Sequence, residues 1–472
     1  MIRHALAAAA AIALTGCAPK VAYVKPATPA PAAAFKENAD WKTAQPRDQM
    51  LRGAWWDLFA DPQLAALESQ VDISNESLRA AQARFFQARA VIGVNHAALA
   101  PQVTVNPSIT GVDPSGNRPT TSATAKYADF VLPADVSYEA DVWGRVRASV
   151  AAARAAAQAS AADVESVRLS VHAELAADYF QLRGVDAEQQ LLDTAVAAFT
   201  RALELTQNRF RGGIASEADV AQAETQLETT RAQAQDLAVG RAQLEHAIAV
   251  LVGRPASTFS LAPLPLTMPP PPIPAGVPSD LLERRPDIAA AERRAAAANA
   301  DLGVARAAYF PRLLLTGSAG FESGSLATWL AGLSNFWSLG PAMAATIFDG
   351  GRRRAVSAQA QAAYDESVAN YRDTTLRAFE EVEDNLAALR VLDREATTQA
   401  AAVAAAERSL TLATNRYRGG VASYLEVITA QSAALTNERA AVGILTRRLT
   451  ASVLLVKALG GGWSGTLPAV GP

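Results

Sequence analysis

The sequence predicts a mixed α and β fold that is built twice from long antiparallel helical hairpins and pairs of amphipathic strands. The first observation is a nine-residue string, NRFRGGIAS at 208–216, which returns 207 positions later as NRYRGGVAS at 415–423. The second is the surroundings of each copy, where long Ala-rich runs have helical spacing and other segments alternate between apolar and polar residues. A repeat of this quality indicates a duplicated unit.

The repeated string predicts the tip of a helical hairpin. A Gly pair after Arg ends a helix, because Gly adopts the left-handed backbone without a Cβ clash. Ser216 and Ser423 then fit as N-caps of the returning helices. A helix from about 145 to 211 would be on the order of 100 Å long. The four long helices are predicted at about 145–211, 217–251, 352–418 and 424–459.

Four segments alternate with a period of two, which is typical of strands with one apolar and one polar side. In the first segment, Val103, Val105 and Ile109 share one face. These lengths suit tilted membrane-spanning strands, and acids on the polar side suit a water-filled lumen. A hairpin packed on a soluble core has the same alternation, so the pattern alone leaves both interpretations open. The strands are predicted at about 102–112, 129–141, 312–322 and 336–348.

Four strands are too few to close a membrane barrel, because known barrels begin at about eight strands and a spanning sheet must have no open edge. The chain should therefore share one barrel with copies of itself in a ring. Two copies or three would supply enough strands, and the sequence does not choose between them.

Composition and motifs argue against several other classes of protein. The net charge of −3 gives no basic surface for nucleic acid. Cys17 is the only cysteine, so no disulfide can form within one chain. No zinc-protease, P-loop or serine-hydrolase string occurs, and His172 and His246 are expected on helix surfaces or in helix seams. We therefore expect no enzyme, no catalytic or metal-binding residue and no cofactor.

The N-terminus resembles a lipoprotein export signal. Arg3 and His4 precede a short apolar stretch that ends in Leu14-Thr15-Gly16-Cys17, the form of a bacterial lipobox. Cys17 is therefore predicted to carry a covalent diacylglycerol and acyl lipid, which is an anchor rather than a membrane span. An ordinary signal peptide with an incidental cysteine is the alternative.

The predicted organisation follows the repeat. The predicted segments are a signal peptide at 1–16, a lipidated extended segment at 17–60, a first repeat at 61–260 with its tip at 211–216, a Pro-rich linker at 261–279, a second repeat at 280–460 with its tip at 418–423, and a tail at 461–472.

The string LLERRPDI at 281–288 resembles the outer-membrane efflux channels of the TolC superfamily, in its NodT-type lipoprotein class. Phe310-Pro311, the turn at 141–145, Trp55-Trp56 and both tips carry the same resemblance. It implies a homotrimer whose twelve-stranded barrel, four strands from each copy, lies in the outer membrane of a Gram-negative bacterium, with a helical barrel that crosses the periplasm. It also implies a passive duct whose partners are a periplasmic adaptor protein and an inner-membrane pump, usually of the resistance-nodulation-division kind. Ala18, in place of an aspartate after the lipidated cysteine, favours the outer membrane.

The resemblance also suggests gate residues. Asp219 matches an acid that links neighbouring tip helices, and Tyr417 matches one of its partners. Leu425 matches a constriction leucine and Glu426 a lumen-facing acid, whereas Thr429 stands where relatives often carry a second acid. Asp219 and Glu426 also suit a helix first turn for electrostatic reasons alone, and Leu425 suits simple packing.

The exposed tips are the predicted contact with the adaptor. The tip candidates are Gly213, Ile214, Ala215, Ser216, Gly420, Val421, Ala422 and Ser423. Ala422 replaces an arginine partner of the gate acid, which predicts a weaker link. Two rival functions remain: the channel of a type I protein-secretion system, and a pore-less structural coiled-coil lipoprotein.

Overall fold

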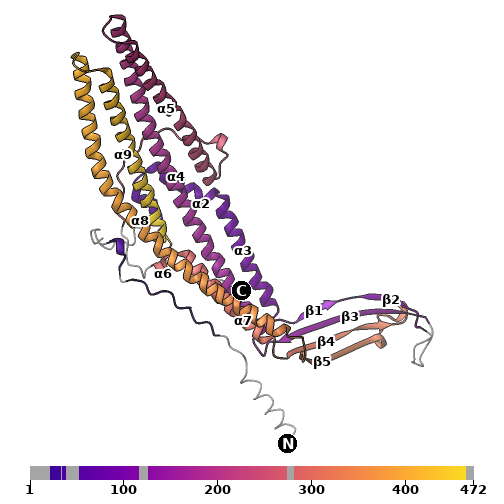
Figure 1. The fold of residues 1–472 in the computed structure, drawn as a ribbon. Coiled ribbons are helices and arrows are strands. Elements are labelled where there is room, and N and C mark those ends of the chain that lie inside the picture. Colours follow the sequence, from indigo (N-terminus) through magenta and orange to yellow (C-terminus); the bar gives the residue numbers. More distant parts are fainter. Residues whose placement is uncertain (1–21, 33, 39–52, 116–125, 274–280, 464–472) are drawn as a thin grey trace.

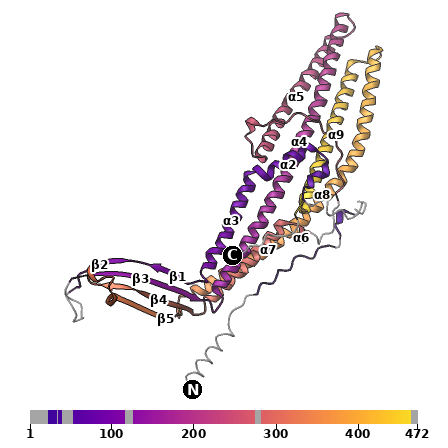
Figure 2. The same ribbon diagram turned by 180° about the vertical axis from the view of Figure 1, so that it is seen from behind.

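The computed structural model describes residues 22–32, 34–38, 53–115, 126–273 and 281–463. The predicted signal peptide and Cys17 lie outside these residues. The described chain forms a long helical body with a β-sheet that projects from one end and two helical tips at the other (Figures 1 and 2). The predicted separation of strands and tips is therefore confirmed.

The helical body repeats the same plan in both halves. Within the described residues no helix is both long and apolar enough to cross a membrane. The helices α4 and α8 each have 67 residues, and α5 and α9 each have 35. The offset of 207 therefore holds along both hairpins. The helices are α2 (Pro62–Ser74), α3 (Glu76–Ala97), α4 (Arg145–Arg211), α5 (Glu217–Leu251), α6 (Leu281–Arg284), α7 (Pro286–Ala307), α8 (Arg352–Arg418) and α9 (Tyr424–Ala458).

Short 3-10 helices complete the helical elements of the described residues. They are η1 (Lys36–Asn38), η3 (Trp55–Phe59), η4 (Ala256–Thr258), η6 (Leu326–Thr328) and η7 (Gly332–Ser334). The first two lie within the segment 17–60, which was predicted to be extended. Phe35, Trp55 and Phe59 are buried, so apolar packing favours the local helical turns. Asp61 caps α2 as its position before Pro62 predicts, accepting hydrogen bonds from the Gln63 and Leu64 amides.

The sheet is antiparallel in the order β1-β3-β4-β5, and β2 also pairs with β3. Its strands are β1 (Gln102–Val105), β2 (Ser108–Val112), β3 (Tyr127–Ala140), β4 (Arg312–Ser323) and β5 (Asn335–Ala344). The first predicted strand is broken at Pro107, which has no N–H to donate. The predicted fourth strand is too long, because Ala344 pairs with Arg312, where β4 begins, and later residues have no partner on that strand.

The register places rows of apolar residues from β1, β3, β4 and β5 on one face. Directly paired residues of neighbouring strands share a face. One row joins Val103, Val136, Gly317 and Leu339, the next joins Val105, Ala134, Ala319 and Trp337, and a polar row between them joins Thr104, Asp135, Ser318 and Ser338. The side chains of Trp337 and Leu339 are 78% and 79% exposed. The predicted alternation of apolar and polar residues thus produces a continuous apolar surface on one face of the sheet.

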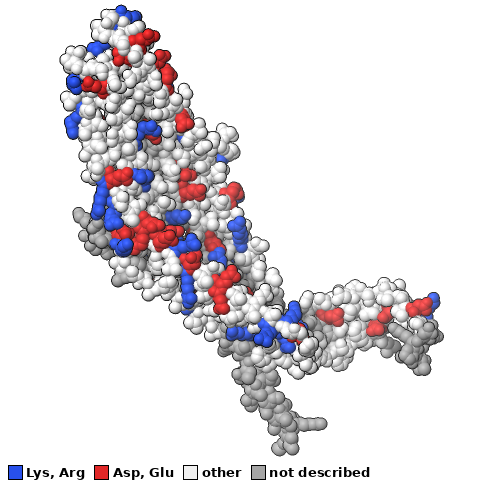
Figure 3. Space-filling model, in the orientation of Figure 1, with Lys and Arg blue, Asp and Glu red and all other residues white. Residues whose placement is uncertain are grey.

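Charged side chains are distributed differently over the helical body and the β-sheet. They are spread with both signs over the helical body, whereas fewer lie on the sheet in the face seen in Figure 3. Basic residues gather where helices and strands meet (Figure 3). At that junction Arg145 forms an ion pair with Glu139, and Trp143 donates a hydrogen bond to the Pro311 carbonyl.

The main core lies midway along the body, where helices of both halves and the linker pack together. It includes Tyr179 and Phe180 of α4 and Val453 and Leu455 of α9. The described part of the linker, 261–273, has no helix or strand, and its Leu261 and Ile273 are buried in this core. The linker is therefore packed onto the body rather than merely spanning two units.

The LLERRPDI string is explained by one buried arginine. Arg285 forms ion pairs with Asp287 and with Glu381 of α8, and it donates a hydrogen bond to the Ala458 carbonyl at the end of α9. Charge-assisted, multidentate contacts of this kind hold elements in one geometry. Arg285 thereby fixes the start of α7 against the second hairpin.

Candidate functional site at the helical tips

The two tips have the same backbone. Gly213 and Gly420 both adopt φ of +76°, the left-handed conformation in which a Cβ is strained. In each tip the amide of the first Gly donates to the Asn carbonyl four residues earlier, and that of the second donates to the aromatic residue's carbonyl. Ile214 and Val421 follow with side chains that are 79% and 69% exposed. The residues predicted to contact an adaptor thus include two apolar side chains at the far end of the body.

The first tip continues through a complete capping box. The Ser216 hydroxyl accepts a hydrogen bond from the Asp219 amide, and the Asp219 carboxylate accepts one from the Ser216 amide at 2.9 Å. This arrangement satisfies two backbone donors at the start of α5. Asp219 lies in the first turn of α5, as its predicted electrostatic role requires, and it also completes the capping box, while its role in a gate stays a prediction.

The second tip has different side-chain contacts. Ser423 occupies the N-cap position, but its side chain makes no capping hydrogen bond. Glu426 instead forms an ion pair with Arg416 at 3.0 Å. Leu425 is 53% exposed, and the Thr429 hydroxyl donates to the Leu425 carbonyl of its own helix. Leu425 is thus available to line an opening, and its constriction role stays a prediction.

Arg209 joins the two tips and was not predicted from the sequence. Its guanidinium lies 4.2 Å from the centre of the Tyr417 ring and donates to the main-chain carbonyls of Tyr417 and Arg418. A cation over an aromatic face and a donor at a helix C-terminus are both favourable. The Arg209 contact therefore links α4 of the first hairpin to the end of α8 in the second.

Tyr417 is buried beneath this arginine, with 7% of its surface exposed. It packs against Tyr424 and, with Val427 and Ile428, against Ala223 of the first hairpin. Within the described part of the chain, the Asp219 side chain forms its hydrogen bonds with Ser216 and none with Tyr417. Among the described residues the Tyr417 hydroxyl has no hydrogen-bond partner.

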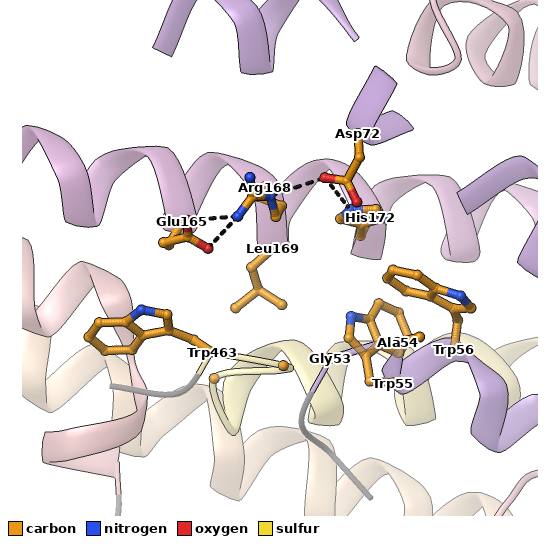
Figure 4. A pocket seen from close by; sticks show the side chains of 12 residues that line it. Gly53, Ala54, Trp55, Trp56, Asp72, Glu165, Arg168, Leu169, His172 and Trp463 are labelled. Carbon is orange, nitrogen blue, oxygen red and sulfur yellow. Dashed lines mark hydrogen bonds and ion pairs between the residues drawn. The ribbon is translucent and has the colours of Figure 1, made fainter. Parts of the chain in front are cut away.

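A cavity of about 490 Å³ lies in the helical body beside the main core (Figure 4). Trp56 stacks on His172 with ring centres 4.6 Å apart, and Arg168 bridges Glu165 and Asp72. Trp55 is almost completely buried. The lining residues are Gly53, Ala54, Trp55, Trp56, Asp72, Glu165, Arg168, Leu169, His172, Gly460, Gly462 and Trp463.

His172 is a buried member of an ionisable pair. Its Nδ1 lies 2.5 Å from Oε2 of the fully buried Glu68, and its Nε2 lies 3.6 Å from the Asp72 carboxylate. The helix-surface alternative for His172 was therefore wrong, because α2 covers this side of α4. Burial raises the pKa of the Glu68 carboxyl to about 7, with a smaller contribution from Asp72, while His172 lowers it. Sequence periodicity did not identify this pair, since its two members are 104 positions apart.

The two halves of the chain, residues 67–254 and 277–461, both match the family described as outer membrane efflux protein. The chain belongs to this family. It is similar to the outer membrane protein OprJ of Pseudomonas aeruginosa, with 33% identity over 469 residues that cover 96% of this chain and 94% of OprJ. It is also similar to the toluene efflux pump outer membrane protein TtgC of Pseudomonas putida, with 32% identity over 459 residues that cover 97% of this chain and 95% of TtgC.

A solved structure of the outer-membrane channel OprN has the same fold. It superposes with a TM-score of 0.87 at 30% identity and covers 95% of this chain and 100% of that one. The outer membrane efflux protein described here is therefore a TolC-like outer-membrane channel component of a tripartite efflux system. The family is one of channels rather than enzymes.

Proposed function

We propose that this outer membrane efflux protein is a homotrimeric, lipid-anchored, passive exit duct for small molecules. A periplasmic adaptor would dock on its tips, and an inner-membrane pump of the resistance-nodulation-division kind would supply the energy. The named efflux relatives support small molecules over proteins as cargo, since TtgC belongs to a toluene pump. Lipidation at Cys17 is supported by the lipobox at 14–17.

The proposal of a barrel shared between copies rests on the structure of the sheet. Its apolar rows run across β1, β3, β4 and β5, yet β1, β2 and β5 each pair with a single neighbouring strand among the described residues. Unpaired backbone groups at a sheet edge cannot be left in hydrocarbon, because each costs several kcal/mol there. Further copies of the same sheet supply those partners, and three copies give a barrel of ordinary size.

The experiment uses the full chain purified in detergent. We expect a mass of three chains by light scattering and steady ion conductance in planar bilayers. Monomers that conduct no ions would refute the duct. Cys17→Ser provides the test of the anchor: the wild-type chain should incorporate radiolabelled palmitate in cells, and the variant should not.

A further inference from the structure

Arginines at the starts of the two longest helices are neutralised in the first half of the chain and not in the second. At the start of α4, Arg145 forms an ion pair with Glu139 at 2.8 Å, and Arg147 forms one with Asp141 at 3.1 Å. Each arginine therefore has its own carboxylate. Glu139 belongs to β3 and shares the polar face of the sheet with Asp135, because the two are four residues apart on one strand.

The repeat keeps both arginines in the second half and removes their acids. At the offset of 207, the arginines correspond to Arg352 and Arg354 of α8. Thr346 and Phe348 stand where the two acids would be. Arg352 and Arg354 are exposed, and neither forms an ion pair among the described residues. Since the first arginine of α4 reaches a carboxylate on the polar face of the sheet, its counterpart Arg352 is positioned to reach the same face.

The helix α8 therefore begins with an excess of positive charge. Arg353 is neutralised, because it forms an ion pair with Asp349 at 2.7 Å, and it also lies 5.6 Å from the centre of the Tyr309 ring. The first turn of α8 contains no acidic residue. Positive side chains are unfavourable in a first turn, because the N-terminal end of a helix carries partial positive charge. An anion beside the two remaining arginines would relieve this repulsion.

A third arginine lies beside them on the polar face of the sheet. Arg312 is the first residue of β4 and shares a face with Ser318, six residues later. The contact of Tyr309 with Arg353 places this end of β4 next to the start of α8. Arg312 is exposed and has no ion-pair partner in the described part of the chain. Basic side chains gather at this junction in Figure 3.

The rest of the polar face carries the opposite charge. The strand register places Asp129, Asp135 and Glu322 on it. Glu322 is ten residues after the start of β4, so it lies about 30 Å farther along the sheet. The polar face therefore changes from positive beside the helices to negative along the strands.

Resting on the proposed barrel, in which the polar face lines the lumen, we propose that Arg312, Arg352 and Arg354 form a positive band that binds anionic small molecules at the base of the barrel. The groups bound are carboxylates, sulfonates or phosphates, whose oxygens accept the paired N–H donors of arginine. Each copy in the ring contributes three arginines. The band thus determines which cargo is held where the lumen enters the barrel, whereas the acids beyond it favour cations.

Block of the ion current by a multivalent anion tests the band. Inorganic tripolyphosphate should reduce the conductance of wild-type channels in neutral phosphatidylcholine bilayers, most strongly at low salt, because salt screens exposed charges. The triple variant Arg312→Gln, Arg352→Gln and Arg354→Gln should need about tenfold more tripolyphosphate for the same block. Lysine at the same three positions keeps the charges and should preserve most of the block. Arg418→Gln, at the far end of α8, should behave as wild type.

The outcomes separate the band from the duct. Channels that conduct but are blocked equally in the wild type and the glutamine variant would overturn the band and leave the duct intact. If that variant instead lost co-purified phosphatidylglycerol while its block was unchanged, the arginines would face lipid, which also overturns the band. Equal weakening of the block by Arg418→Gln would place the anion elsewhere. Chains that never conduct would overturn both the band and the duct.

Discussion

The two tips share nearly the same sequence and the same backbone, yet they differ in what surrounds them. Tyr417 is buried under Arg209, whereas Phe210 at the equivalent position is exposed. Ser216 caps its helix, whereas Ser423 does not, and Glu426 pairs with Arg416 instead. The backbone follows from the residues of the tip itself. The side-chain contacts differ, since Arg209 of the other hairpin covers Tyr417 whereas Phe210 is 44% exposed.

A similar difference separates the two halves of the chain in the main core. His172 corresponds to Phe379, which packs in the main core without an ionisable partner. In the first half α2 has 13 residues and provides Glu68, whereas its counterpart α6 has four. The second half therefore replaces a buried ionisable pair with apolar packing. Substitution of such pairs by apolar residues is often neutral for stability, so the pH response expected from Glu68 has no counterpart around Phe379.

The largest expected effect is the pH response of Glu68. Its pKa is raised from 4.5 to about 7, so between these values the native state holds a proton that the unfolded chain releases. Stability from this group is present below pH 4.5 and is lost as the pH rises through about 7, on the order of 3 kcal/mol. Glu68→Gln should therefore flatten the decline of the thermal midpoint across this window.

The control for this experiment is Glu76→Gln, which removes an exposed acid at the start of α3. That variant should keep the wild-type slope of midpoint against pH. If Glu68→Gln also kept the wild-type slope, the buried carboxyl would not be the source of the pH response. The two halves would then not differ in pH response at the His172 and Phe379 positions.

A smaller effect should distinguish the two serines of the tips. Ser216→Ala removes a capping hydrogen bond and should destabilise the start of α5 by about 1 kcal/mol. Ser423→Ala removes a side chain that makes no capping bond and should change stability little. Hydrogen exchange of the amides in the first turns of α5 and α9 measures both effects. Equal acceleration in the two tips would show that the difference in capping does not persist in solution.

The sequence was a good guide wherever structure follows from local patterns. The Gly pairs, the caps and the helical spacing predicted both hairpins to within a residue or two, since each is a property of a few adjacent residues. The alternation predicted four strands, but the end of the last strand depends on where Arg312 begins its partner. A strand boundary set by a neighbour cannot be read from the strand alone.

Contacts between distant segments were beyond the sequence. Arg209 stands in the repeated string, but its target is the other copy of that string, 208 positions away. Its counterpart Arg416 shows that the same residue in the same motif forms a different contact. The pairing of His172 with Glu68 likewise needed the position of α2 on α4. In these cases the motif identified the residue and the packing decided its partner.

The smallest structural effect is expected for Tyr417→Phe, which makes the second tip resemble the first. The Tyr417 hydroxyl has no hydrogen-bond partner among the described residues, so its removal should leave the protomer's thermal midpoint almost unchanged. If that hydroxyl and Asp219 link tips in the assembled channel, Tyr417→Phe combined with Asp219→Ala should raise the open probability in planar bilayers. Asp219→Ala alone also weakens the capping box, so the single variant must be measured beside the pair. A double variant that opens no more often than wild type would leave Asp219 a capping residue only.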